Sequence, residues 1–214
     1  MKISILTSDP KHPVVKYLMV WKNLMIKNGH EVFLCFDKTE LSDGDILFLV
    51  SCGQIIKASV RKSFKSVLVL HASDLPAARG WSPHIWAILS GENEITVSLL
   101  EADDPVDSGK IWLKQKFSLN GHELLNEINA KLFQTELELM TKAVEDYDTI
   151  NPQSQIGDPG EYMSKRTPDH SRLQTEISIA DQFDLLRVVD NERYPAFFDH
   201  RGHRYIIKIE KLQK

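Results

Sequence analysis

Residues 67–76 read VLVLHASDLP, a short apolar run followed by a histidine and a turn that ends in proline. The apolar run is typical of a buried strand, and open parallel sheets bind their ligands beside the carboxyl ends of the strands. His71, directly after the run, is therefore expected to project into such a crevice. Asp107 begins a second turn, DSG, thirty-six residues later. Acyl-transfer chemistry often uses a histidine and a carboxylate, so the pair predicts an enzyme.

The residues before this stretch alternate strand and helix patterns. Short apolar runs at 3–6, 32–36 and 46–50 predict three more strands. Apolar residues keep helical spacing over 13–29, and residues 54–64 predict a second helix. Four strands joined by helical crossovers indicate an α/β fold with a Rossmann-like, mostly parallel sheet and helices on both faces.

The pattern changes after the proline turn. Residues 83–89 predict a helix with proline at its first position, and residues 94–100 and 110–118 alternate as strands do. Asp107 then lies in the loop between those two strands. A long amphipathic helix over 121–148 closes the core.

Residues 151–160, NPQSQIGDPG, are polar and rich in turn-forming residues, which is typical of a linker. The linker divides the chain into a catalytic domain, residues 1–150, and a short C-terminal α/β appendage, residues 151–214, that contributes to substrate binding or dimerisation. The appendage is expected to contain a helix over 179–189, a turn at 194–195 and a terminal strand over 205–209.

The composition excludes several classes of protein. With 42% hydrophobic and 26% charged residues, the chain is ordinary for a globular protein, and its net charge of −4 is unlike that of a nucleic-acid binder. Cys35 and Cys52 form neither a disulfide framework nor a CxxC metal pair. Because no signal-peptide region or membrane-length apolar run occurs, we expect a cytoplasmic protein without membrane contact.

Four motifs in order carry a family resemblance: HASxLPxxRGxxP (71–83), AIxxG (87–91), TV (96–97) and DSGxI (107–111). Together they resemble the formyltransferases that use N10-formyltetrahydrofolate, and the match is strong over residues 45–118. That family includes methionyl-tRNA formyltransferase, glycinamide ribonucleotide formyltransferase and the sugar N-formyltransferases. The resemblance implies the formyltransferase fold, N10-formyltetrahydrofolate as formyl donor and no metal.

Three further segments are most similar to the sugar branch: GWSPHIW (80–86), YxxKRTPD (162–169) and YPAFF (194–198). They imply a nucleotide-sugar substrate, a UDP- or dTDP-linked 4-amino-4,6-dideoxy sugar such as a precursor of pseudaminic acid. The tRNA enzyme carries a further C-terminal domain, and we expect the residues after the linker to be too few for it. The glycinamide ribonucleotide enzyme has a glycine-rich phosphate loop, whereas TSDPKHP (7–13) contains no glycine.

The chemistry of formyl transfer gives the two turn residues separate roles. The reaction needs a neutral amine, a stabilised oxyanion and a proton for the departing nitrogen. His71 is expected to donate to the oxyanion and shuttle the proton. Asp107 is expected to hold the imidazole and draw a proton from the amine, directly or through water.

Val69 departs from the family pattern, which has an asparagine two residues before the histidine. Valine cannot donate a hydrogen bond. We expect a substitute donor from the loop of Ser51, Cys52, Gly53 and Gln54, with Gln54 or a backbone N–H as candidates. A non-catalytic, folate-binding relative is the alternative interpretation.

The resemblance also implies two sets of binding residues. The folate pocket is expected to use main chain and side chains of Ser51, Cys52, Gly53, Gln54, Ile55, Leu100, Ala102, Asp103, Asp104 and Val106. The sugar nucleotide is expected to contact Ser73, Arg79, Gly80, Trp81, Lys165, Arg166, Arg187 and Tyr194. Ordinary surface charge is an equal alternative for any one of the basic residues, and a solvated acidic turn is the alternative for residues 101–107.

Other interpretations are open or weaker. A formyltransferase that acts on a peptide-bound or carrier-bound amine is the rival enzyme. A zinc hydrolase built on His71, His84 and His122 lacks the usual ligand spacing, and a lone histidine such as His84 is more typical of a structural role. The apolar residues 196–198 either pair two chains in a homodimer or cap the core.

Overall fold

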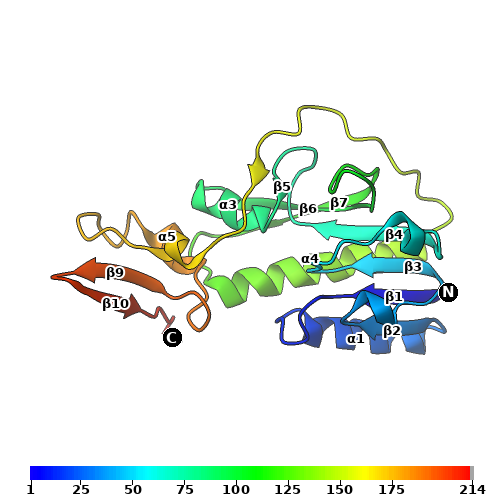
Figure 1. The fold of residues 1–214 in the computed structure, drawn as a ribbon, viewed down its shortest axis with the longest axis horizontal. Helices are drawn as coiled ribbons and strands as arrows, with labels where there is room; N and C mark the ends of the chain where they lie inside the picture. Colours follow the sequence, from blue (N-terminus) through cyan, green and yellow to red (C-terminus); the bar gives the residue numbers. More distant parts are fainter. Residues whose placement is uncertain (213–214) are drawn as a thin grey trace.

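A computed structural model describes residues 1–212, so the last two residues of the expected appendage lie outside the described part. Its centre is a six-stranded sheet with the order β2-β1-β3-β4-β6-β7. The elements of the first half are β1 (Lys2–Leu6), α1 (Val15–Lys27), β2 (Glu31–Cys35), the 3₁₀ turn η1 (Lys38–Glu40), β3 (Gly44–Leu49), α2 (Ala58–Arg61) and β4 (Phe64–His71). Figure 1 shows the parallel strands β4, β3, β1 and β2 one below another, pointing toward the C-terminal part of the chain.

The last two strands of the sheet run antiparallel to their neighbours. The elements of this part of the chain are β5 (Arg79–Gly80), α3 (Pro83–Leu89), β6 (Glu94–Glu101), β7 (Ile111–Ser118) and α4 (Leu125–Glu145). β6 pairs antiparallel with β4, and β7 pairs antiparallel with β6. The predicted α/β fold with a mostly parallel sheet is confirmed: the parallel strands β2-β1-β3-β4 extend from one edge of the sheet.

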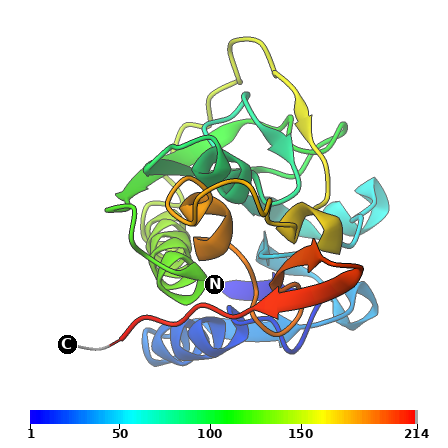
Figure 2. The ribbon, with the colours of Figure 1, turned by 90° about the vertical axis from the view of Figure 1, so that its left-hand side faces the viewer.

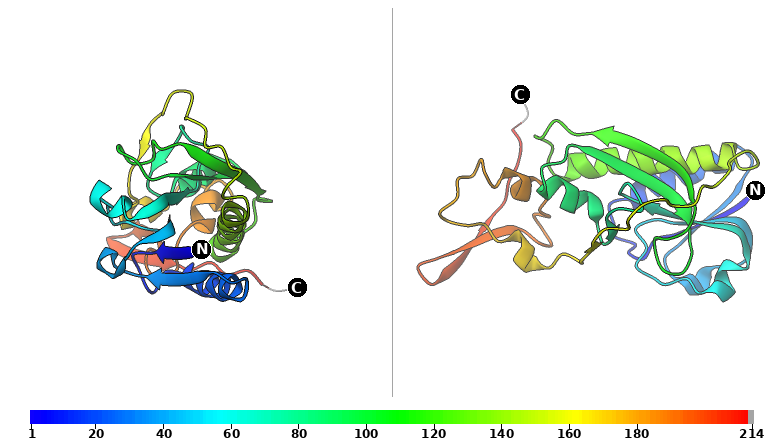
Figure 3. Two further views of the ribbon diagram at one scale, coloured as in Figure 1. Left: turned by 90° about the vertical axis from the view of Figure 1, so that its right-hand side faces the viewer. Right: turned by 90° about the horizontal axis from the view of Figure 1, so that it is seen from above.

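Apolar side chains cover both faces of the sheet, as the continuous hydrophobic runs predict. On one face α1 and α4 pack over Ile5, Phe48 and Leu70. Trp21 of α1 lies edge-on to Phe48, and its indole N–H donates to Thr141 of α4 at 2.8 Å. The other face packs under α2 and its flanking loop. Seen from above, α4 runs lengthwise beside β6 and β7 (Figure 3).

The C-terminal part forms a separate small layer beyond the carboxyl ends of the parallel strands. It contains β8 (Tyr162–Met163), the 3₁₀ turn η2 (Pro168–Ser171), α5 (Phe183–Arg187), β9 (Ala196–His200) and β10 (His203–Ile207). Leu173, Leu186, Val189 and Ala196 form its own buried cluster. Figure 2 faces the β9–β10 hairpin, with the sheet behind it. β8 returns to the first part and pairs in parallel with β5.

Three local expectations are corrected by the structure. The helix expected over 54–64 is a single turn, because Lys57 is extended and Gln54 is bonded to the chain after β2. The helix expected over 179–189 covers only α5. The expected terminal strand begins earlier, and a strand before it, β9, was not predicted. Arg201 and Gly202 both have positive φ, which is the backbone of a tight two-residue hairpin turn.

None of the helices within residues 1–212 has an apolar stretch of the length and character that a bilayer crossing takes.

The buried Glu136 of α4 gives a prediction for stability. Its side chain is 4% exposed, and its Oε2 has no hydrogen-bond partner within residues 1–212. Burial raises the pKa of this carboxyl from 4.5 to about 8. Between these values the unfolded chain releases the proton that the folded chain keeps, so stability falls as pH rises. Glu136→Gln should therefore raise the free energy of unfolding by about 2 to 4 kcal/mol at pH 7.5 and by much less at pH 5.

Thermal unfolding of both proteins at the two pH values measures this difference. Glu145→Gln, which changes an exposed residue of the same helix, is the matched control and should have little effect at either pH. An equal gain from Glu136→Gln at pH 5 and pH 7.5 would show that ionisation is not the cause.

Candidate active site

The structure brings His71 and Asp107 together. His71 is the last residue of β4 rather than the first residue after it, and Asp107 lies in the loop between β6 and β7. The Nδ1 atom of His71 is 3.6 Å from Oδ1 of Asp107. The two residues are only 6% and 7% exposed, respectively. Their interaction is therefore sheltered from water, and electrostatic contacts are stronger in such a buried place than at the surface.

Backbone groups orient both side chains. The Nε2 atom of His71 lies 3.1 Å from the carbonyl oxygen of Ala78, and because a carbonyl only accepts, Nε2 carries a hydrogen in this arrangement. The backbone N–H of Gly80 donates to Oδ2 of Asp107 at 3.2 Å. The turn at residues 77–80 thus contacts the histidine and the aspartate at once.

Strained backbone surrounds this pair. Ser51, Ala78 and Asp107 have φ angles of 48°, 53° and 62°, in the left-handed region that costs most non-glycine residues about 1 to 2 kcal/mol. Gly109 has no alternative, since a Cβ there would lie 1.9 Å from the carbonyl oxygen of Glu101. Such strain is typical of functional sites, where the surrounding fold holds it in place.

Gln155 fastens the aspartate loop from the segment expected to be a linker. Its Nε2 donates to the carbonyl oxygens of Asp107 at 2.9 Å and Gly109 at 2.8 Å. The adjacent Gln153 pairs with Ile111 in an isolated antiparallel bridge. No pattern around Gln155 distinguishes it from a loop glutamine, so sequence reasoning alone misses it.

His84, expected to have a structural role, lies beside the pair. It is the second residue of α3, and its Nδ1 is buried without a hydrogen-bond partner within residues 1–212. Burial, and to a smaller extent the charge of a protonated His71, together lower its pKa to about 4. The imidazole of His84 is therefore neutral at pH 7.

The loop expected to bind folate adjoins the site from the β3 side. The N–H of Gly53 donates to Oγ of Ser8 at 2.8 Å. A Cβ on Gly53 would be 3.5 Å from the indole of Trp81, so this loop and Trp81 are neighbours. Ser51 and the partly exposed Cys52 precede Gly53, and Ile55 is 62% exposed.

Gln54 does not serve as the expected replacement for the family asparagine. Its Nε2 donates to the carbonyl of Phe36 at 2.9 Å, and its Oε1 accepts from the N–H of Lys38 at 3.1 Å. Both ends of the amide are bonded to the segment after β2. This corrects the expectation that Gln54 donates to the reacting group.

The second expected folate segment follows β6. Leu100 is fully buried within β6, so only its main chain could face a ligand. The N–H of Ala102 donates to the carbonyl of Val67 at 2.8 Å. The carboxylate of Asp103 accepts from the N–H of Asp104, whose own carboxylate pairs with Arg61 at 2.6 Å. Val106 is 50% exposed and offers an apolar surface.

The expected substrate residues are only partly brought together. Ser73, Arg79, Gly80 and Trp81 surround the turn after His71, and the β5–β8 pairing sets Tyr162 opposite Arg79. The ammonium of Lys165 lies 4.9 Å from the centre of the Trp81 ring. Tyr194 is 45% exposed and lies farther along the chain, in the turn before β9.

Two of the expected basic residues are engaged elsewhere. Arg187 is 1% exposed, pairs with Asp184 at 2.6 Å and donates to Asn93 at 3.0 Å, so it stabilises the contact between α5 and the start of β6. Its expected role in substrate binding is therefore corrected. Arg166 donates to the carbonyls of His170 at 3.1 Å and Val188 at 3.4 Å, and burial lowers its pKa.

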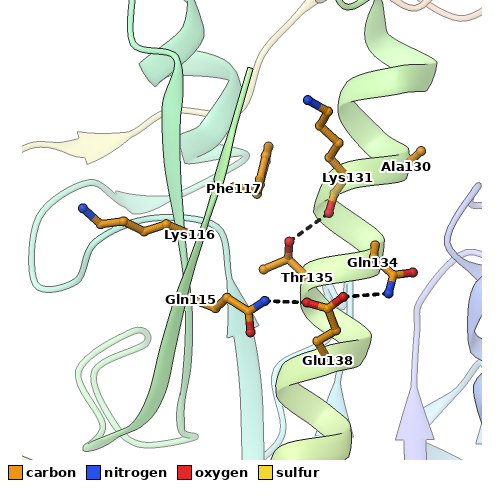
Figure 4. Close-up of a pocket in the computed structure, with 8 residues that line it drawn as sticks. All are labelled: Gln115, Lys116, Phe117, Ala130, Lys131, Gln134, Thr135 and Glu138. Carbon is orange, nitrogen blue, oxygen red and sulfur yellow. Dashed lines mark hydrogen bonds between the residues drawn. The ribbon is translucent and has the colours of Figure 1, made fainter. Parts of the chain in front are cut away.

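A separate shallow groove lies between β7 and α4 (Figure 4). Gln115 of β7 donates to Glu138 of α4 across it, and Glu138 also accepts from Gln134 of the same helix. The groove is on the α4 side of the sheet. Because side chains alternate along a strand, His71 shares the opposite side with Val67 and Val69. The groove is therefore separate from the His71–Asp107 site.

Comparisons with known proteins identify the family of this chain. A family model described as "Formyl transferase" matches residues 34–144. Methionyl-tRNA formyltransferase of Finegoldia magna is 34% identical over 121 residues, which cover 56% of this chain and 38% of that protein. The enzyme of Rickettsia bellii is 30% identical over 137 residues, which cover 64% of this chain and 45% of that protein. The chain thus spans less than half the length of these curated relatives.

Solved structures share the fold over the whole chain. A methionyl-tRNA formyltransferase from Clostridium thermocellum superposes with a TM-score of 0.84 at 21% identity, covering 100% of this chain and 94% of that one. A 4-N formyltransferase from Francisella tularensis gives 0.78 at 18% identity, with 100% and 98% covered. HypX from Aquifex aeolicus in complex with tetrahydrofolic acid gives 0.80 at 18% identity, with 98% and 37% covered. With its four motifs, its sheet topology and the matched family model, the chain belongs to the formyl transferase family.

Proposed function

We propose that this protein transfers the formyl group of N10-formyltetrahydrofolate to the amine of a nucleotide-linked amino sugar. The observation that carries the proposal is the buried His71–Asp107 pair at the carboxyl end of β4, in a chain of the formyl transferase family. In this scheme residues 1–150 form the catalytic domain, and residues 151–214 complete the substrate site or pair two chains.

The formyl carbon of the donor is the electrophile. The folate nitrogen, from which the formyl group departs, takes up one proton. The amine nitrogen bonds to the formyl carbon, the carbonyl electron pair moves to oxygen, and the bond from carbon to the folate nitrogen then breaks. Asp107 accepts the proton that the amine loses, and His71 delivers a proton to the departing nitrogen. The Nε2–H of His71, now on the Ala78 carbonyl, is available to the developing oxyanion.

The imidazole and the carboxylate are 3.6 Å apart, which is too long for a full hydrogen bond. This distance is compatible with these roles, because catalytic hydrogen bonds are often long before substrate binds. A charged imidazole would draw the carboxylate closer. Each proton-transfer group of this kind typically contributes about 10²-fold to 10⁴-fold in rate.

The residues around the pair fit a folate donor. Ile55 and Val106 are exposed apolar side chains from the two expected segments, and both segments offer main-chain groups. A flat heterocycle with many donors and acceptors suits such a surface.

A nucleotide sugar is favoured as acceptor by the surface next to the site. Trp81 and Tyr162 are 42% and 60% exposed, and Lys165 lies over the indole. An aromatic ring beside an ammonium suits a base or sugar joined to a diphosphate. The TSDPKHP loop also lacks the glycines of the glycinamide ribonucleotide enzyme. Solved structures of a 4-N formyltransferase and of a methionyl-tRNA formyltransferase both match over nearly the whole of both chains, so this similarity does not decide between the two acceptors.

A second acceptor is an amino acid carried on tRNA, because the most similar curated sequences given above are methionyl-tRNA formyltransferases. The net charge of −4 speaks against it, since a tRNA-binding surface is usually basic. Transfer to a peptide-bound amine has no specific support in the structure.

The catalytic assignment predicts the effect of His71→Ala. Loss of the imidazole should lower kcat by about 10² to 10⁴ with UDP- and dTDP-linked 4-amino-4,6-dideoxy sugars, followed as release of tetrahydrofolate. His200→Ala, which changes an exposed histidine of the hairpin, should leave the rate unchanged. Full activity of His71→Ala, or turnover only with methionyl-tRNA, would refute the proposal.

The acceptor assignment predicts a different result for Lys165→Ala. Removal of the ammonium beside Trp81 should raise KM for the nucleotide sugar by about 3-fold to 30-fold, because one charge-assisted contact is lost, and leave kcat nearly unchanged. KM for the folate donor should stay constant. Lys208→Ala, which changes an exposed lysine just after β10, is the control, and an equal rise in both KM values would contradict the assignment.

A further inference from the structure

A strap of residues 153–163 runs past both turns of the candidate active site. At its start, the backbones of Gln153 and Ile111 exchange two hydrogen bonds, at 2.8 and 2.9 Å. At its end, the backbone N–H of Trp81 donates to the carbonyl of Met163 at 2.9 Å, where β8 pairs with β5. Main-chain bonds therefore hold both ends of the strap, and these bonds do not depend on the side chains between them.

Gln155 joins the strap to the aspartate loop. Its Nε2 donates to the carbonyl oxygens of Asp107 and Gly109, at 2.9 and 2.8 Å. A primary amide has two N–H donors, so both donors of Gln155 are used in this contact. One partly buried side chain thus fixes the two carbonyls on either side of Ser108.

The backbone of Asp107 needs such support. Its φ of 62° lies in the left-handed region, which aspartate tolerates better than most residues do but still disfavours. The loop also turns back closely onto the end of β6, because a Cβ on Gly109 would lie 1.9 Å from the carbonyl oxygen of Glu101. Hydrogen bonds to the carbonyls of Asp107 and Gly109 therefore oppose the relaxation of this loop.

The backbone conformation of Asp107 decides where its carboxylate lies. Oδ1 is 3.6 Å from Nδ1 of His71, and Oδ2 accepts from the N–H of Gly80 at 3.2 Å. A change to negative φ would redirect the Cα–Cβ bond and take the carboxylate away from both groups. The amide of Gln155 holds the carbonyl of Asp107, and the N–H of Gly80 holds its carboxylate.

We infer that Gln155 is a positioning residue for formyl transfer. Its amide keeps Asp107 in the left-handed conformation that points the carboxylate toward His71. The inference rests on the proposed function, because it concerns the carboxylate that accepts the proton of the amine. Gln155 acts through Asp107 and not on the transferred group.

Gln155→Met tests the inference in the proposed reaction. Methionine has nearly the length of glutamine but no N–H donor. Because small displacements of a catalytic group are costly, kcat should fall by about 10-fold to 10²-fold, while KM for the nucleotide sugar changes by less than about 3-fold. Gln155→Lys, whose ammonium can donate to the same carbonyls, should keep kcat within about 5-fold of the native value. Gln153→Met is the matched control and should leave kcat unchanged, since the Gln153 side chain donates to the carbonyl of Asn151 instead.

Hydrogen exchange at Gly80 tests the position of the carboxylate without turnover. The chain contains two Arg–Gly pairs, Arg79–Gly80 and Arg201–Gly202, so ¹³C-carbonyl arginine combined with ¹⁵N glycine gives two amide signals. Arg201→Lys removes the Gly202 signal and so assigns both. In Gln155→Met the Gly80 amide should exchange about 10-fold faster or more, because its bond to a carboxylate is lost, and the Gly202 amide of the hairpin should not change.

The outcomes separate this inference from the proposed function. If the native protein is active and Gln155→Met keeps its kcat, or if the Gly80 amide of this variant exchanges at the native rate, Gln155 does not position Asp107 and the proposed function stands. A rise in KM for the nucleotide sugar as large as the fall in kcat would show that Gln155 holds the acceptor surface instead, which also overturns the inference. If the native protein transfers no formyl group, the proposed function fails and this inference fails with it.

Discussion

The antiparallel pairing of β6 with β4 holds the site together. His71 ends β4 opposite Ser98 of β6, and the same β6 continues to Glu101, where the loop that carries Asp107 begins. The hydroxyl of Ser98 donates to the carbonyl of Ser73 at 2.7 Å, which joins the turn after β4 to the same strand. The histidine and the aspartate therefore take their positions from one strand pair. A shift in its register by one residue would turn every side chain of β6 to the other face.

Buried polar groups in the candidate active site lower the stability of the fold unless they have hydrogen-bond partners, and most of them have such partners. His71 and Asp107 are both buried, and each has a backbone partner in the turn at residues 77–80. Gln155 adds two hydrogen bonds to the carbonyls of the aspartate loop. The Nδ1 atom of His84 has no such compensation within residues 1–212.

Much of this arrangement could be predicted from the residues, for reasons that differ between elements. The parallel strands contain apolar runs, which predicted their bounds to within three residues, and Pro83 marked the start of α3. β9 was not predicted, because apolar and polar residues alternate only weakly over Ala196–His200 and the segment ends in polar residues. The Gln54 segment has a helical pattern, but its hydrogen bonds to the chain after β2 outweigh that local preference.

In the site, too, some residues could be predicted from the local sequence and others could not. His71 and Asp107 stand in turns with recognisable spacing, whereas His84 and Gln155 depend on distant residues that only folding brings near. Local composition predicts a structural role for a histidine inside an apolar helix. It contains no information about an unpaired nitrogen.

The free edge of β7 has a consequence for solubility. β7 is the last strand of the sheet, and an uncovered edge strand can pair with another chain and begin aggregation. Gln153 bridges to Ile111 and covers the first part of this edge, and Lys114 and Lys116 bring charge to the rest. The segment that holds the aspartate loop through Gln155 thus also covers part of an edge strand that could pair with another chain. Shortening this segment would therefore promote aggregation of the protein as well as disturb the loop that carries Asp107.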